Sequence, residues 1–348
     1  MTRQTQGFVL VAVIWFIALI ALVTAIIGNW MSGGLQGFAA LRDRIVAEQE
    51  LQSATNQVAY LMVSNYFSSR GLEVLSGDAW QQANQPRTLM LEVIPPKDST
   101  YIGLDSRPYR FGHGVIALQD NKGLFNLSDA VGYTFGQIME QYGVPAGDRE
   151  MLFDRLEDYQ NKGPFKRLNG ANRDDYVRAG RTPPRDAPVI TPWEPLRILG
   201  WDSETNLWHA REPFWDIATV SQSHGINPNT APAMVLRTLP GLDDNTIKKL
   251  IEYRATNQIG NLYQMQELLG RQISISPLMI SPFPGNNLRL KAAFPNDPLE
   301  HIVSIALTPT GDAPYRIDYA VELPRAADMQ AALSAADVPG FPSLEQIP

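Results

Sequence analysis

The sequence of 348 residues contains no cysteine, which excludes disulfide frameworks, zinc knuckles, iron–sulfur clusters and thiol nucleophiles together. It is also poor in charge, because only 19% of its residues are Asp, Glu, Lys or Arg. Its 29 Lys and Arg residues face 36 Asp and Glu residues, which leaves a net charge of −7. A surface of that sign repels phosphate, so the composition disfavours a general nucleic-acid binder.

Enzyme motifs are missing as well. The chain has no P-loop, no G-x-S-x-G elbow and no H-E-x-x-H pair, and no metal-ligand spacing relates its four histidines, His113, His209, His224 and His301. Residues 112–117 formally fit a dinucleotide-binding fingerprint, but they lie in a strand-like stretch that leads to a turn. Twenty of the 26 prolines follow residue 180, which argues against a regular parallel sheet and a doubly wound enzyme. We therefore expect no enzyme. An anchored hydrolase with a site assembled from distant residues stays open, without a nucleophile to nominate.

A long apolar run stands near the start of the chain. Phe8 to Ile27 are twenty consecutive uncharged residues, which as a helix at about 1.5 Å per residue span roughly 30 Å of hydrocarbon. A cleaved secretory signal would need a shorter core and a small-x-small site, whereas this run continues into Gly28, Asn29 and Trp30. We predict a membrane helix with the short N-terminal segment inside and the bulk of the chain outside.

The helical pattern continues beyond the membrane. From Leu41 to Met62 apolar residues recur mostly every three or four positions, so one face is expected to pack on a domain. Gly33, Gly34 and Gly37 separate the two halves, and each glycine costs about 1 kcal/mol relative to alanine. We expect a flexible or partly melted junction there.

Strand signals fall into an early and a late group. β-Rich stretches are predicted at 89–94, 109–119, 288–294, 301–308 and 315–323. The last two are joined by a Gly311-Asp312 turn that suits a hairpin. If both groups share one antiparallel sheet, the helical segment between Leu124 and Pro284 is an inserted domain. The tail from Arg325 is expected to hold a short Ala-rich helix and then to fray.

Part of the insert, residues 227–270, is similar to a helix-hairpin-helix unit. Asn229 or Thr230 is expected to cap its first helix, and the second helix opens at Asp243 or Asp244. Related units in DNA-binding proteins hold phosphate on backbone N–H groups at that second helix start. Two carboxylates there complement the helix dipole themselves and repel phosphate, so a protein-packing module is the preferred interpretation.

The N-terminal leader, Met1 to Gly7, resembles the leader of type IV prepilin-like proteins, because Gly7 stands directly before Phe8 and the apolar run. In that family a membrane peptidase cuts after the glycine and methylates the new N-terminal residue, here Phe8. The fifth mature residue is usually a Glu that pairs with the amino group of a neighbouring subunit, and here it is Ala12. A subunit without that Glu is poorly suited to adding beneath another one, but it could start a filament as its topmost member.

Two further segments, Gln119 to Leu127 (QDNKGLFNL) and Ile226 to Ala231 (INPNTA), complete a resemblance to the general secretion pathway protein K family. Its members are the large minor pseudopilins of type II secretion. The resemblance implies an α+β fold in which a pilin-like long N-terminal helix packs on an antiparallel sheet, with a large inserted α-helical domain that contains a helix-hairpin-helix-like (SAM-like) unit. The implied division is a prepilin leader (1–7), a transmembrane helix (8–30), the extramembrane part of that helix (31–66), the sheet (67–123 and 285–325), the inserted domain (124–284, with its hairpin unit at 227–270) and a C-terminal tail (326–348).

The resemblance also implies a function without catalysis: capping the pseudopilus tip, and taking part in its initiation and in protein secretion across the outer membrane. The implied partners are minor pseudopilins of the I, J and H types, the prepilin peptidase, inner-membrane lipid and a secreted protein substrate, with no nucleic acid. The protein would cross the inner membrane once, with a cytoplasmic N-terminus and a periplasmic bulk. The alternative is a membrane-tethered helix-hairpin-helix DNA-binding protein of competence type. Salt-dependent duplex binding that is lost on charge reversal of Lys248 and Lys249 would favour it.

Calcium is the cofactor that the resemblance implies, because K subunits bind it in a comparable acidic region. Oxygen ligands are expected from a helix end and from the far side of a polar loop, namely Asp154, Glu157, Asp158, Asn172, Asp174 and Asp175. The sequence departs from the family's pattern, with Asn172 where an acid is usual and with Tyr159 and Lys162 diluting the first group. Fewer carboxylates imply weaker binding.

Overall fold

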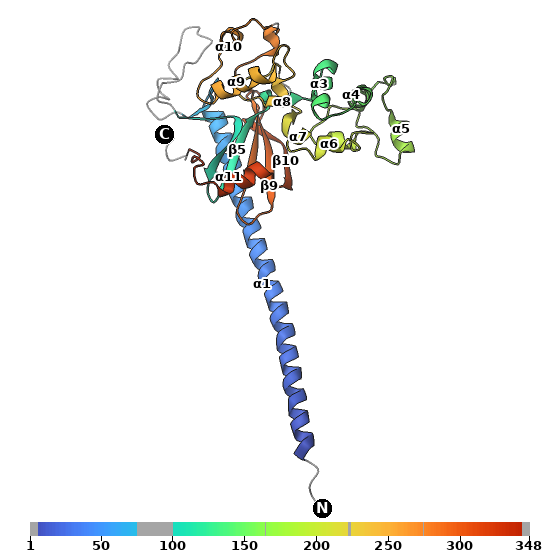
Figure 1. Ribbon diagram of the computed structural model, residues 1–348, viewed down its shortest axis with the longest axis vertical. Helices are drawn as coiled ribbons and strands as arrows, with labels where there is room; N and C mark the ends of the chain where they lie inside the picture. The colour runs from blue at the N-terminus through green and yellow to red at the C-terminus, as the bar shows by residue number, and fades with distance from the viewer. Residues whose placement is uncertain (1–5, 75–99, 164, 222–223, 274, 343–348) are drawn as a thin grey trace, which may run out of the picture.

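The computed structural model describes residues 6–74, 100–163, 165–221, 224–273 and 275–342. Its longest element is helix α1 (Gln6–Ser64), whose first half projects away from the remainder of the chain (Figure 1). The helix runs unbroken through Gly33, Gly34 and Gly37, so the expected melted junction is wrong. Glycine adopts helical dihedral angles, and a propensity loss of about 1 kcal/mol each does not outweigh the hydrogen bonds of a cooperative helix on both sides.

The main sheet is antiparallel and has the strand order β10-β9-β8-β5-β4. Its strands come from two distant parts of the chain: β4 (Asp105–Phe111), β5 (Gly114–Asp120), β8 (Asn287–Ala293), β9 (Leu299–Leu307) and β10 (Tyr315–Pro324). The central pairing joins β5 to β8, with Leu118 opposite Leu290. The early and late strands therefore share one sheet, and β9 and β10 form the predicted hairpin.

One predicted strand is a hairpin. The stretch 109–119 divides into β4 and β5, which turn at Gly112 and His113. Gly112 has a φ of +54°, a left-handed conformation that favours glycine. This turn also shows that residues 112–117 form no dinucleotide-binding loop, because they lead along a strand. The predicted strand at 89–94 lies outside the described residues.

The core of the main sheet lies against the second half of α1. The helix contributes small and branched side chains, and the facing strands contribute buried aliphatic ones, including Ala54, Val58, Leu61, Ile116, Leu118, Leu288 and Leu290. A small antiparallel sheet extends this layer and consists of β1 (Phe67–Ser68), β2 (Gly71–Val74) and β3 (Thr100–Ile102). The alternation of strand side chains leaves the opposite face of the main sheet for other elements to cover.

The C-terminal segment covers part of that opposite face. Helix α11 (Ala327–Ser334) buries Met329 and Ala332 against β5 and β8, as the Ala-rich pattern predicts. The residues after it are ordered as far as Pro342, so the expected fraying is wrong for this stretch. The N–H of Arg110 donates to the carbonyl of Pro339, and the N–H of Phe341 donates to the carbonyl of Arg110. The tail thus pairs with the free edge of β4.

The segment between β5 and β8 forms a body with its own core, seen beside and above the sheet in Figure 1. Its helices are α3 (Gly132–Gln141), α4 (Ala146–Gln160), α5 (Arg173–Arg178), α6 (Thr205–Trp208), α7 (Phe214–Ile217), α8 (Ala233–Leu236), α9 (Asp244–Arg254) and α10 (Leu262–Leu269). A short parallel pair joins β6 (Phe125–Asn126) to β7 (Ala218–Thr219). The predicted α+β class, a long helix packed on an antiparallel sheet with a helical insertion, is confirmed.

Candidate functional site

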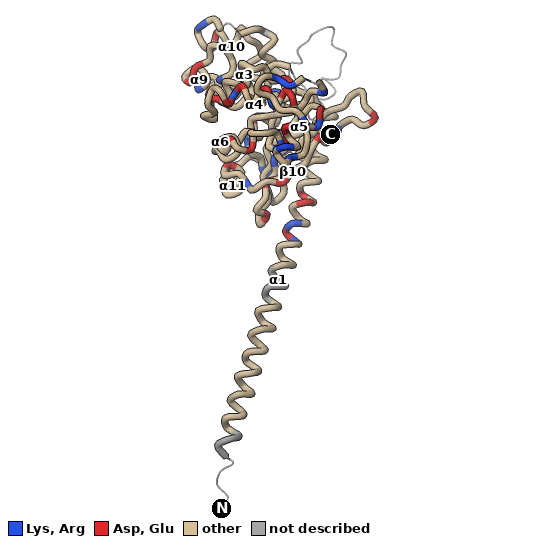
Figure 2. The backbone as a smooth tube through the Cα atoms, turned by 90° about the vertical axis from the view of Figure 1, so that its right-hand side faces the viewer, with Lys and Arg blue, Asp and Glu red and all other residues tan. Residues whose placement is uncertain are grey.

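The N-terminal half of α1 is the first candidate. Gly7 and Phe8 lie in its first turns, and Ala12 follows about one turn later. Leu10 to Met31 is long and apolar enough to cross a membrane, and no other helix in the described part of the chain is. None of this span is buried within the protein, and its first charged residue beyond the leader is Arg42 (Figure 2). An uncharged helix with bare apolar side chains requires lipid or other apolar helices around it.

A bare stretch of helix separates this span from the head, our term for the packed body formed by the described residues from Ala47 to Pro342. Among the α1 residues whose side chains the structure describes, Ala47 is the first that is buried, 16 positions after Met31. At about 1.5 Å per residue the stretch is roughly 24 Å long. Phe38, Leu41 and Ile45 are exposed on it by 74%, 56% and 47%. Because these apolar side chains are largely exposed, the stretch can pack against neighbouring helices outside the bilayer.

The two sequence segments that carry the family resemblance meet at the end of β5. Asp120 is fully buried, and its Oδ2 accepts hydrogen bonds from Asn227 Nδ2 at 2.9 Å and Thr230 Oγ1 at 3.0 Å. Its Oδ1 accepts from the main-chain N–H groups of Lys122 and Gly285, both at 3.0 Å. Burial raises the pKa of Asp120, while these hydrogen bonds act in the opposite direction. One carboxylate thus joins the start, middle and end of the inserted segment.

The loop after Asp120 packs closely against the INPNTA segment. A Cβ at Gly123 would lie 2.5 Å from Thr230 Oγ1 and 2.9 Å from the Thr230 carbonyl oxygen. Only glycine allows that approach without a shift of the backbone. The glycine in the QDNKGLFNL segment therefore has a structural role, and so do the Asn and Thr of the INPNTA segment.

A second set of contacts ties the inserted domain to the outer face of β8. Arg289 is fully buried and donates to the carbonyl oxygens of Trp215, Asp216 and Ala218 around α7. Lys291 Nζ lies 2.6 Å from Asp216 Oδ1 and 3.7 Å from Glu300 Oε1. Burial lowers the pKa of Lys291, but the two carboxylates outweigh that effect and raise it. The side chain therefore stays charged as an internal counter-ion.

The helix-hairpin-helix-like unit is formed by α8, α9 and α10. Asp243 caps α9 by accepting from the N–H of Thr246 at 2.8 Å, and Arg271 donates to Asp243 and to the Gly241 carbonyl. Hydrogen bonds from Thr246 lower the pKa of Asp243. The place where related units hold phosphate is thus occupied by a carboxylate of the chain itself. The cap by an acid at the helix start is confirmed, and the protein-packing role of the unit stays a prediction.

The predicted cap of the first helix is wrong. Pro232 is the N-cap of α8, whereas Thr230 points to Asp120 and Asn229 binds elsewhere. The side-chain amide of Asn229 donates to the carbonyls of Ile259 and Pro282. Both residues serve long-range contacts, which local capping preferences do not reveal.

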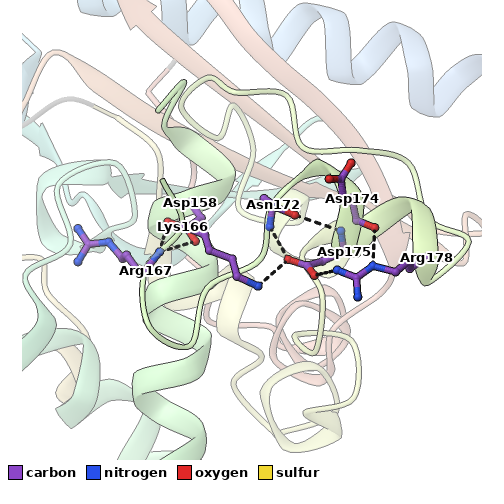
Figure 3. A network of polar contacts seen from close by, with 7 residues as sticks. All are labelled: Asp158, Lys166, Arg167, Asn172, Asp174, Asp175 and Arg178. Carbon is purple, nitrogen blue, oxygen red and sulfur yellow. Dashed lines mark hydrogen bonds and ion pairs between the residues drawn. The ribbon is translucent and has the colours of Figure 1, made fainter. Parts of the chain in front are cut away.

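The predicted calcium ligands lie on two elements. Asp154, Glu157 and Asp158 belong to the last turns of α4. Asn172 caps α5, and Asp174 and Asp175 stand in its first turn; Figure 3 shows these three residues together with Asp158. Nearly all of these carboxylates already accept hydrogen bonds from N–H groups or pair with basic side chains. Within the described ranges, no three His, Asp or Glu side chains are grouped so that they could hold a metal ion. The residues therefore do not fit a calcium ion in this arrangement.

The tryptophans of the insert pack against one another. Trp201 and Trp208 are buried, and Trp208 stacks on Trp215 with ring centroids 5.8 Å apart. Trp193 in turn stacks on Trp215 and meets Tyr319 of β10 edge to face. The series is thus part of the core and helps to hold the insert on the sheet.

Comparison with solved structures finds a similar chain in "The Crystal Structure of the GspK-GspI-GspJ complex from enterotoxigenic Escherichia coli Type 2 Secretion System". The two chains share 14% sequence identity with a TM-score of 0.47, and the alignment covers 81% of this chain and 100% of that chain. No protein-family model matches the sequence, and no curated protein matches it. A functional conclusion therefore has to come from the residues and geometry of the chain itself.

Proposed function

We propose that this chain is a minor pseudopilin of type II secretion, of the general secretion pathway protein K family, and that it caps the pseudopilus tip. The observation that carries the proposal is the division of α1. Its first half is apolar and bare, and its second half forms the core with an antiparallel sheet. A helix divided in this way can pack sideways among like helices in lipid while it holds a folded head outside the bilayer. The leader ending at Gly7 supports the same proposal.

The tip position is supported by the shape and rigidity of the head. The inserted domain spreads to one side of the α1 axis (Figure 1). Asp120 and two buried basic side chains, Arg289 and Lys291, bind the inserted domain and hold it in that position. In a repeating shaft each subunit has copies above and below it, and a wide rigid head is tolerated only at an end. Ala12 agrees with this position, since a topmost subunit pairs with no amino group above it.

The partners and the location follow from this role. We propose that minor pseudopilins of the I, J and H types pack against the bare part of α1, and that the prepilin peptidase processes the leader. Inner-membrane lipid surrounds Leu10 to Met31, the N-terminus is cytoplasmic and the head is periplasmic. Contact with a secreted protein at the tip belongs to the same proposal.

The N-terminal residue of the membrane-bound protein tests the proposal. Mass spectrometry of protein purified from membranes is expected to find an N-methylated Phe8 as the first residue. Gly7→Val should leave the leader attached. Gly28→Ala is the matched control, because a Cβ at Gly28 meets nothing within 4 Å and that glycine flanks the other end of the apolar run. An intact Met1, or a chain cut beyond Ile27, would overturn the proposal.

A further inference from the structure

The loop between α4 and α5 presents N–H groups to the carboxylates around it. The N–H of Arg167 lies 3.0 and 3.2 Å from the two carboxylate oxygens of Asp158. The N–H of Asn169 lies 3.1 Å from Asp154 Oδ2, and the Asn169 side-chain amide donates to the same oxygen. Asp154 and Asp158 are one helical turn apart, so they bind the returning loop at successive points.

The loop thus directs hydrogen-bond donors at the carboxylates, whereas a calcium-binding loop directs oxygen acceptors at the ion. A calcium ion needs carboxylate and carbonyl oxygens directed at one point, with their lone pairs available. Here N–H donors bind both carboxylate oxygens of Asp158 and one oxygen of Asp154, and the loop backbone lies directly on Asp158. A Cβ at Gly170 would fall 1.7 Å from Asp158 Oδ2. At Gly170 the loop backbone therefore leaves no space for an ion against Asp158 Oδ2.

Basic side chains pair with two of the remaining carboxylates, Asp175 (Figure 3) and Glu157. Lys166 Nζ lies 3.1 Å from Asp175 Oδ2, and an Arg178 nitrogen lies 2.5 Å from Asp175 Oδ1. Arg167 pairs with Glu157 at 2.9 Å. The side chains of Asp175 and Asn172 also complete a reciprocal capping box at the start of α5. Cations from the loop and from α5 thus pair with Glu157 and Asp175.

We propose that Lys166, Arg167 and Arg178 are built-in counter-ions that hold residues 165–178 in place, so that the folding of this segment does not require a divalent cation. The proposal concerns the inserted domain alone and does not rest on the pseudopilin function. Its consequence is that calcium neither stabilises the protein nor is needed to fold it. Removal of the basic side chains, in contrast, should weaken the segment whether calcium is present or not.

Thermal unfolding of the full chain in detergent micelles tests this inference, followed by tryptophan fluorescence because Trp193, Trp201, Trp208 and Trp215 lie in the inserted domain. The midpoint is expected to be the same in chelator and in millimolar calcium. The double variant Lys166→Gln/Arg178→Gln should lower it by about 1 to 3 °C in both conditions, as the loss of partly exposed ion pairs predicts. Lys162→Gln is the control, since Lys162 is exposed in the same loop and has no ion pair among the described residues.

Two results would overturn the inference. One is a rise of several degrees in the wild-type midpoint on addition of calcium but not of magnesium, which would show a specific cation site. The other is a double variant that melts at the same temperature as Lys162→Gln in chelator, which would show that the basic side chains do not hold the segment in place.

Discussion

The carboxylate of Asp120 receives hydrogen bonds from groups that are up to 165 residues away in the sequence. A buried carboxylate is costly unless its lone pairs are satisfied, and here four donors converge on it. The same four donors would be left without an acceptor if the side chain were removed. One residue therefore makes several of the contacts that connect the sheet to the inserted domain.

Asp120→Ala should lower the free energy of unfolding by about 2 to 4 kcal/mol, because several buried donors lose their partner at once. Urea unfolding of the full chain in micelles measures this loss. Asp129→Ala is a suitable control, since the Asp129 side chain is 67% exposed and contacts only His224 at 3.5 Å among the described residues. Equal stability of the two variants would contradict the role assigned to Asp120.

Asp175 predicts an acid dependence of stability with a definite sign. Hydrogen bonds from the Asn172 backbone and the Lys166 side chain lower its pKa in the folded state. A lowered pKa adds stability above the unfolded value, about 3.9 for Asp, and that stability is lost as the pH falls through the folded value. Asp175→Asn should therefore lose less stability than the wild type below about pH 4. Unfolding curves measured across that range would contradict the prediction if the two proteins lost stability in parallel.

At this scale the sequence predicts some roles and misses others for a physical reason. The Asp243 cap depends on its own helix, so a local pattern reveals it. Asp120, Asn227 and Thr230 stand in segments that the family resemblance singles out, but their mutual contact spans more than 100 residues. Likewise the acids near α4 suggest a cation site, and only the path of the loop shows that N–H groups face them.

Among the elements, the long apolar and amphipathic runs were the most predictable. Helix α1 and the strands β8, β9 and β10 lie close to their predicted ranges, although β8 and β9 are buried on both faces. The stretch 109–119 was predicted as one strand, because both arms of the tight hairpin that it forms have strand-like composition. The order of the tail was not predicted, because its proline-rich sequence has no periodicity. It is ordered by pairing with the edge of β4.

The tail provides a test at the scale of one element. The Phe341 ring lies 5.9 Å from the ring centroids of both Tyr109 and Phe111. Gln57 of α1 donates to the carbonyl of Pro342 at 2.6 Å, so the tail bridges the sheet and the helix. Phe341→Ala should lower the free energy of unfolding by about 2 kcal/mol through the loss of this aromatic packing.

The matched control for that variant is Leu278→Ala, because Leu278 is 86% exposed. Its free energy of unfolding should stay close to that of the wild type. Faster exchange of the β4 amide hydrogens is expected for Phe341→Ala alone, since its edge pairing would be released. Unchanged exchange at Arg110 would contradict the proposed cover of the sheet edge.

For the whole molecule, the proposed role requires that the apolar half of α1 packs among other helices while the wide head stays at the tip.

A carboxylate at position 12 would restore the pairing group of a shaft subunit. We expect Ala12→Glu to insert into the membrane and to lose placement at the tip, because a Glu left without a partner amino group is costly in lipid. Ala18→Glu places a carboxylate in the same helix away from the pairing position, and it controls for the general cost of the charge. Fibres with unchanged tip occupancy in Ala12→Glu would show that the missing carboxylate does not select the tip.

The position of the chain on assembled fibres tests the central claim most directly. Gold-labelled antibodies against the inserted domain can be imaged on fibres sheared from cells that express this chain with the other pseudopilins. The proposed role predicts label at one end of each fibre. Label distributed along the shaft, or fibres that form in normal number without this chain, would contradict it.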